Sequence, residues 1–122
     1  MRYRRKGGMR LREANGAAIF EIAGDADAAT ARELRAGIDA YTARPNARVV
    51  VDLSSAASID ASMLGVLEFS ARSLAVVSGR FAIVCPTGDI SDMFELTGLE
   101  HSLPLHATRA EALASVGGPA AT

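Results

Sequence analysis

The sequence predicts a single α/β domain of the order β-β-α-β-α-β-α-β-α, with a small mixed sheet and about four helices. Short β-branched runs alternate with segments whose apolar residues recur at helical spacing. The first two strands are instead separated by Asn15-Gly16, the strongest short hairpin signal. We therefore expect an antiparallel first strand, with the other strands mainly parallel because helices connect them.

Turn residues and helix caps mark the boundaries between the predicted elements. Residues 10–13 and 17–23 form the hairpin, and a helix follows that Asp27 caps and Pro45 closes. The apolar face of that helix consists of Ala31, Leu34, Ile38 and Tyr41. The remaining strands are expected at 48–53, 81–85 and 103–106, and the remaining helices at 62–77, 90–97 and 109–116. Gly98 stops the third helix, and Thr108 with Glu111 forms a capping box for the last.

Composition limits both the domain organisation and the class of protein. Of 122 residues, 49% are apolar but only 5% aromatic, which indicates one aliphatic core. We expect a basic disordered tail at 1–8, the domain at 9–116 and a flexible end at 117–122. The net charge of -1 gives no reason to expect direct nucleic-acid binding.

Several other signals are missing from the sequence. No apolar run approaches the roughly 18 residues typical of a membrane span, and no apolar segment follows the charged start as in a secretory signal. Cys85 is the single cysteine, so an intrachain disulfide cannot form and we expect a cytoplasmic protein. There is no phosphate-cradling G-x-x-x-x-G-K motif, so no cofactor is expected.

Functional residues in such sheets tend to lie beyond the carboxyl ends of the strands. Two loops are expected there, at 24–27 and at 54–62. Asp25 and Asp27 could form half of a metal site, but two carboxylates without a third ligand favour a solvated turn and a helix cap. We therefore predict no metal site.

Ser62 opens the second helix and has three interpretations: a helix cap, a catalytic nucleophile or a modified switch. Catalysis is disfavoured because the G-x-S-x-G elbow is missing and both histidines, His101 and His106, lie near the last strand. A cap, formed by Ser62 or Asp60, and a switch are compatible, because a helix N-terminus tolerates a phosphate. We therefore predict no catalytic residue.

The second helix is more apolar than one buried stripe requires. Leu64, Leu67, Ala71 and Leu74 fit such a stripe, but Met63, Val66, Phe69 and Val77 do not all fit it. Either the helix is wedged between neighbouring elements, or its first turn offers an apolar surface to a partner. The sequence leaves both interpretations open.

Residues 9–116 resemble a STAS domain of the anti-sigma-factor antagonist family. The most specific match is the segment DLSSAASIDASMLG, in which a strand ends in D-L-S and a helix begins just after an acidic residue. A second match is a G-x-x-D-x-x-T-A-x-x-L pattern made by Gly24, Asp27, Thr30, Ala31 and Leu34.

This resemblance implies a non-enzymatic regulator that binds an anti-sigma factor acting also as a serine kinase. Ser62 matches the phosphorylated position, and its phosphorylation would release that partner. The partner-binding residues are expected to be Asp25, Asp27, Asp60, Ser62, Met63 and Val66. One departure is Met63, which stands where the family has glycine and could hinder docking or act as an interface anchor.

The resemblance also allows a second function. STAS domains occur as subunits of ABC-type lipid-transport complexes, where the domain would bind the transport ATPase without a phosphorylation switch. Copurification from the native host would separate the two functions by the identity of the bound protein. A homodimer is also left open.

Overall fold

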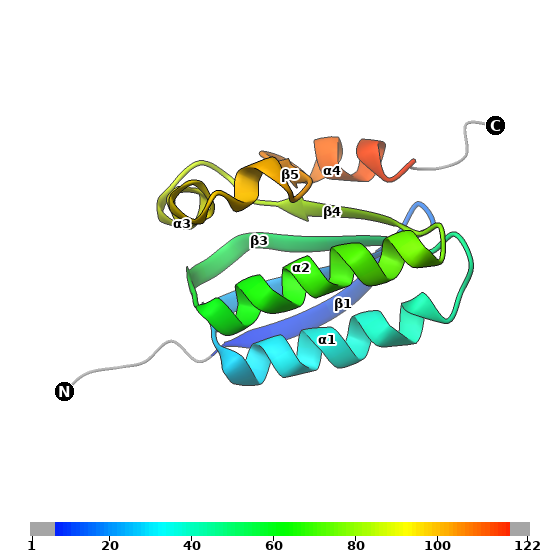
Figure 1. The fold of residues 1–122 in the computed structure, drawn as a ribbon, viewed down its shortest axis with the longest axis horizontal. Coiled ribbons are helices and arrows are strands. Elements are labelled where there is room, and N and C mark those ends of the chain that lie inside the picture. Colours follow the sequence, from blue (N-terminus) through cyan, green and yellow to red (C-terminus); the bar gives the residue numbers. More distant parts are fainter. Residues whose placement is uncertain (1–6, 118–122) are drawn as a thin grey trace.

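A computed structural model describes residues 7–117 and shows one five-stranded sheet (Figure 1). The strands are β1 (Gly8–Ala14), β2 (Ala17–Ala26), β3 (Arg48–Ile59), β4 (Arg80–Val84) and β5 (Leu105–His106). They lie in sequence order across the sheet. β1 is antiparallel to β2, and the other neighbouring pairs are parallel, so the predicted mixed sheet is confirmed.

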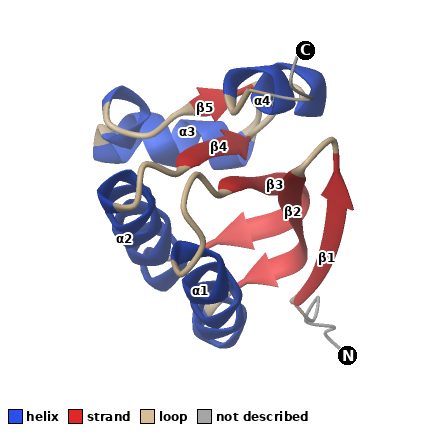
Figure 2. Ribbon diagram, turned by 90° about the vertical axis from the view of Figure 1, so that its right-hand side faces the viewer, coloured by secondary structure: helices blue, strands red, loops and turns tan. Residues whose placement is uncertain are grey.

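The helices cover the two faces of the sheet unequally. They are α1 (Ala28–Thr42), α2 (Ala61–Val76), α3 (Asp89–Thr97) and α4 (Arg109–Ser115), with a short 3-10 helix, η1, at Leu99–His101. Figure 2 shows α1 and α2 side by side against one face and α4 at the other side of β4. The element order is therefore the predicted one, with η1 as an addition.

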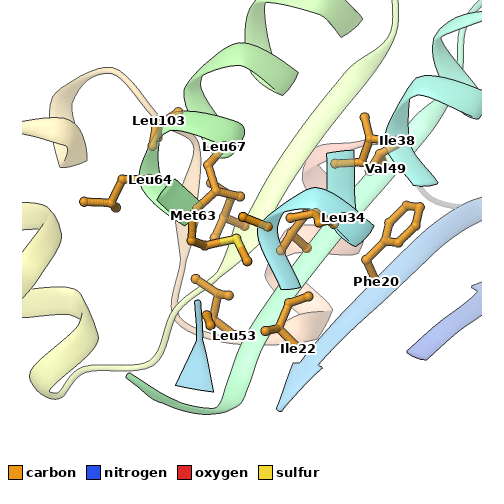
Figure 3. Packing of buried hydrophobic residues seen from close by; sticks show 14 of the residues in the cluster. Phe20, Ile22, Leu34, Ile38, Val49, Leu53, Met63, Leu64, Leu67 and Leu103 are labelled. Carbon is orange, nitrogen blue, oxygen red and sulfur yellow. The ribbon is translucent and has the colours of Figure 1, made fainter. Parts of the chain in front are cut away.

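The main core lies between the sheet and the pair α1 and α2. Alternate residues of β2 and β3, such as Phe20 and Val49, point toward Leu34 and Ile38 of α1 and toward Leu67 of α2 (Figure 3). Alternation on the strands and three- to four-residue spacing on the helices bring these side chains together, as the sequence pattern predicts. Aliphatic burial of this kind stabilises the fold by roughly 1.5–3 kcal/mol for each large side chain.

A smaller core lies on the opposite face under α4. It consists of buried residues from β2, β3, β4 and α4: Ala17, Ile19, Val50, Ala82, Val84, Ala112 and Val116. α4 is only seven residues long and contacts β3, β4 and β5. The part of this face over β1, β2 and the neighbouring part of β3 is therefore left with an open groove whose lining includes charged residues.

The predicted turns and caps are largely confirmed. Asn15 and Gly16 adopt positive φ values of 55° and 80°, as a type I′ hairpin turn requires. Asp27 caps α1, and Gly98 ends α3 in the left-handed conformation. The box at α4 is modified: Thr108 accepts from the Glu111 N–H, but the Glu111 carboxylate accepts from the N–H of the residue before Thr108.

Two predicted boundaries are wrong. The segments 24–27 and 54–62 are mostly not loops, because β2 continues to Ala26 and β3 to Ile59. Small residues in these segments hide the strand pattern, and two register shifts in the β2–β3 pairing interrupt it. Gly8 belongs to β1 rather than to a tail, whereas the rest of the predicted tails, apart from Gly7 and Gly117, lies outside the described residues.

A glycine pair provides a test of the packing between α1 and the sheet. A Cβ on Gly37 of α1 would lie 2.6 Å from Cε1 of the fully buried Phe20, whereas a Cβ on Gly65 of α2 would meet no atom within 4 Å. We expect Gly37→Ala to lower the free energy of unfolding by about 1–3 kcal/mol through overpacking. Gly65→Ala should raise it by up to ~1 kcal/mol. Urea unfolding of both variants checks this, and equal effects would contradict the close packing.

Candidate functional site

The extended ends of β2 and β3 bring the predicted acidic residues to one end of the sheet. Asp25 pairs with Ser58 across the strands, and the next residue of each strand continues the pairing. The Asp60 N–H donates to the Ala26 carbonyl at 3.2 Å. Asp25, Asp27 and Asp60 therefore lie together where α1 and α2 begin, as predicted.

The two acidic residues of the β2 end have different hydrogen-bond partners. The Ser58 hydroxyl donates to Asp25 at 2.8 Å. Asp27 accepts from the Thr30 N–H at 3.1 Å and from its hydroxyl at 3.2 Å. The backbone bond from Thr30 is the main cause of an Asp27 pKa below its ordinary value. Asp27 is thus held as an anion at neutral pH, and its role as the α1 cap is confirmed.

Ser62 lies in the first turn of α2 and is exposed. Asp60, not Ser62, is the N-cap: its carboxylate accepts from the Met63 N–H at 3.1 Å. Among the described residues, no side chain or backbone group hydrogen-bonds to the Ser62 hydroxyl. The hydroxyl is therefore accessible, beside the Asp60 carboxylate and at the positive end of a helix of 16 residues.

Met63 does not lie on the surface that the sequence analysis assigned to it. Its side chain is 0% exposed and packs in the main core, with Ile22, Leu34 and Leu53 around it (Figure 3). Position 63 follows the cap by three residues, which turns it toward the sheet while Ser62 turns toward solvent. The expectation that Met63 is an interface anchor is wrong, and the methionine is not a steric barrier beside Ser62.

The rest of α2 favours the wedged interpretation of its apolar residues. Leu64, Leu67 and Leu74 are buried, and Val66 is only partly exposed against the core. The Arg35 guanidinium covers the Phe69 ring at 4.1 Å from its centroid. Two apolar residues were predicted to contact a partner, Met63 and Val66. Met63 is buried, so Val66 is the one of the two that keeps a partly exposed surface in the first two turns of α2.

Sequence analysis missed an ionic network on the opposite face of the sheet. Arg109 of α4 donates to Asp52 at 2.6 and 2.9 Å and to Glu21 at 2.5 Å, and Arg12 also contacts Glu21. The signal was the charged residue Asp52 near the end of the buried run RVVVDL, because a carboxylate needs a partner when it is buried. The partner of Asp52 is Arg109, and this pairing depends on how α4 packs against the sheet.

The remaining candidate groups are possible metal ligands and the single cysteine. Over residues 7–117, no group of three His, Cys, Asp or Glu side chains is placed to hold a metal ion. Cys85 is buried, and burial raises the pKa of its thiol to about 11, so it does not have the properties of a reactive thiol. In the same part of the chain, no helix has the length and hydrophobicity to cross a membrane.

The family follows from a match over most of the chain. A model of the STAS domain matches residues 9–112, which include both strand ends and the first turn of α2. The chain belongs to the STAS domain family. The resemblance inferred from DLSSAASIDASMLG is thus confirmed at the level of the family.

Known relatives of this STAS domain have related names. A Thermotoga neapolitana protein, a TM1081 homolog named as a candidate anti-sigma factor antagonist, is 32% identical over 71 residues, or 58% of this chain and 63% of that protein. The chain thus matches less than two thirds of that relative. A solved anti-sigma factor antagonist from Mycobacterium paratuberculosis is 26% identical, with a TM-score of 0.80 over 91% of this chain and 94% of that one.

A third comparison concerns the fold alone. The unphosphorylated form of the anti-sigma factor antagonist SpoIIAA has a TM-score of 0.74 at 21% identity, over 89% of this chain and 96% of that one. SpoIIAA has also been solved in a phosphorylated form. The arrangement of sheet and helices described here is therefore shared with proteins of distant sequence.

Proposed function

We propose that this STAS domain is an anti-sigma-factor antagonist that works as a partner switch. It binds an anti-sigma factor that is also a serine kinase, and phosphorylation of Ser62 releases that partner. The observation that carries the proposal is the exposed Ser62 hydroxyl in the first turn of α2, next to the Asp60 cap and the β2 end. The names of the relatives support the class of partner.

The proposed binding surface consists of residues at this end of the sheet: Asp25, Asp27, Asp60, Ser62 and Val66. Its three carboxylates suit a partner with basic side chains, and Val66 adds a small apolar contact. Met63 is left out because it is buried. A binding role of this kind requires no catalytic residue in the domain.

Electrostatics explains how a phosphoryl group would act at Ser62. It adds about -1.5 to -2 charges at neutral pH. The α2 N-terminus tolerates that charge within the free domain. In the complex, the same charge would have to be desolvated beside Asp60 and near Asp25 and Asp27, so it would weaken docking.

The phosphoacceptor is tested by incubating the domain with its cognate kinase and ATP, followed by mass measurement. We expect one phosphoryl group, with transfer of the γ-phosphoryl from ATP to the Ser62 oxygen and loss of the hydroxyl proton. Ser62→Ala should remain unmodified, whereas Ser115→Ala on α4 should be modified like the wild type. Phosphate retained by Ser62→Ala would place the acceptor elsewhere.

The switch itself is tested with Ser62→Asp. We expect this variant to bind the anti-sigma partner at least about tenfold more weakly, which corresponds to roughly 1.4 kcal/mol. Ser115→Asp adds the same charge on α4, on the other face of the sheet, and should bind like the wild type. Calorimetry measures both affinities. Equal affinity of Ser62→Asp and Ser115→Asp would rule out charge at Ser62 as the releasing event.

A further inference from the structure

We propose that the open groove on the α4 face of the sheet binds a small oxyanion, a molecule with a phosphate or carboxylate group. The groove lies over β1, β2 and β3 and has a volume of about 520 Å³. That volume falls within the range of small-ligand sites, about 300–1,000 Å³. This site is separate from the proposed partner surface.

Strand register explains why charged residues gather in the groove. Arg10 of β1 pairs with Glu21 of β2, and Glu21 pairs with Asp52 of β3, so one row of the sheet is ionic. Arg12 lies two residues along β1 on the same face and contacts Glu21 at 3.1 Å. Arg109 reaches this row from α4.

The balance of charges favours an anion over a cation. The groove is lined by three arginines and two carboxylates, a formal surplus of one positive charge. Both carboxylates already accept from guanidinium groups: Glu21 from Arg12 and Arg109, and Asp52 from Arg109. A cation would have to displace these hydrogen bonds to reach the carboxylates. An oxyanion would instead accept further hydrogen bonds from the guanidinium groups.

Further donors lie on the wall formed by β3. Ser54 and Ser55 both line the groove and are exposed. The Ser54 N–H is engaged by Asp52 at 2.8 Å, which fixes the backbone at this point. The two hydroxyls and the planar guanidinium groups are the donor types that bind phosphate and carboxylate oxygens.

The full chain can be titrated with sodium phosphate and, separately, with sodium malonate at constant ionic strength, with amide chemical shifts as the readout. We expect saturable shifts in β1 and at Ser54 and Ser55 with at least one of the two anions. The double variant Arg10→Gln with Arg12→Gln should bind at least about tenfold more weakly, as expected when charged hydrogen-bond donors are lost.

The matched control carries Arg32→Gln with Arg72→Gln, two exposed arginines of α1 and α2 on the other face of the sheet. It loses the same charge and should keep the wild-type affinity. The proposal is overturned if neither anion gives saturable shifts, or if both double variants lose affinity equally. In the second case, anion binding would depend on the net charge of the protein and not on the arginines of the groove. The pattern of unshifted amides shows whether each variant is folded.

Discussion

Replacing Met63 by glycine is expected to lower the free energy of unfolding by about 3–5 kcal/mol. The side chain is fully buried among Ile22, Leu34 and Leu53, so its removal leaves a cavity in the main core. Truncation of a buried methionine to alanine costs about 2–5 kcal/mol, and glycine in a helix adds up to ~1 kcal/mol. Urea unfolding provides the measurement.

Met63→Leu is the matched control, because it keeps the volume and should cost less than about 1.5 kcal/mol. If Met63→Gly were as stable as Met63→Leu, the methionine would not be part of the core. The same variants also test the proposed switch. Since Met63 does not cover Ser62, the rate of Ser62 phosphorylation in Met63→Leu should equal that of the wild type.

Replacing Arg109 by methionine is expected to destabilise the domain by about 2–4 kcal/mol at neutral pH. Asp52 has a side chain only 6% exposed, and Arg109 donates to it through two nitrogens. Removing one partner of such a pair leaves a buried charge uncompensated. The expected loss of stability is smaller than the roughly 3–5 kcal/mol typical of a fully buried pair. The reasons are that the Arg109 side chain is 39% exposed and that the Ser54 N–H still donates to Asp52.

The pH dependence of that loss follows from Asp52. Burial raises its pKa, but the bonds from Ser54 and Arg109 outweigh burial, so the pKa lies below the ordinary 3.8. A lowered pKa stabilises the wild type above the unfolded-state value of about 3.9, and this contribution is lost as the pH falls through the lower folded-state pKa. Without the guanidinium, the contribution of Arg109 to lowering this pKa is lost, so the pKa of Asp52 in the variant lies above that in the wild type and ionisation stabilises the variant less. The stability gap should therefore narrow as the pH falls below about 4.

Arg12→Met is the control for the second experiment. Arg12 contacts Glu21 in an exposed pair, with 54% of its side chain accessible, so its loss should cost less than about 1 kcal/mol. Unfolding of the three proteins between pH 3 and pH 7 provides the comparison. Equal losses for Arg12→Met and Arg109→Met would show that the buried carboxylate does not depend on α4.

The fold could be predicted because its signals are local. Asn15-Gly16 specifies the hairpin, Asp27 caps α1, and Gly98 ends α3, each through the backbone conformation of a few neighbouring residues. The helical stripe containing Leu34 and Ile38 is likewise visible without tertiary information. These features were sufficient to give the order of elements and the sheet.

The errors arose where tertiary contacts decide the outcome. The strand ends beyond Ala23 and Leu53 consist mostly of small and polar residues, and they are extended because the two strands pair with each other. Met63 was assigned to the partner surface because it follows Ser62, where the resemblance places a glycine, but packing in the main core buries both Met63 and Leu64. The link between Arg109 and Asp52 spans 57 residues and could not be predicted from spacing.

The single cysteine makes it possible to measure local opening of this domain by thiol labelling. Cys85 directly follows β4, its N–H donates to the His106 carbonyl at 2.8 Å, and its thiol stays protonated at physiological pH. The thiolate is the nucleophile toward thiol reagents, so labelling requires a local opening that exposes the Cys85 side chain, which is buried in the main core. Alkylation of the native chain therefore reports openings of the core around Cys85, and crosslinking of two copies through Cys85 would mark molecules in which this region has already opened.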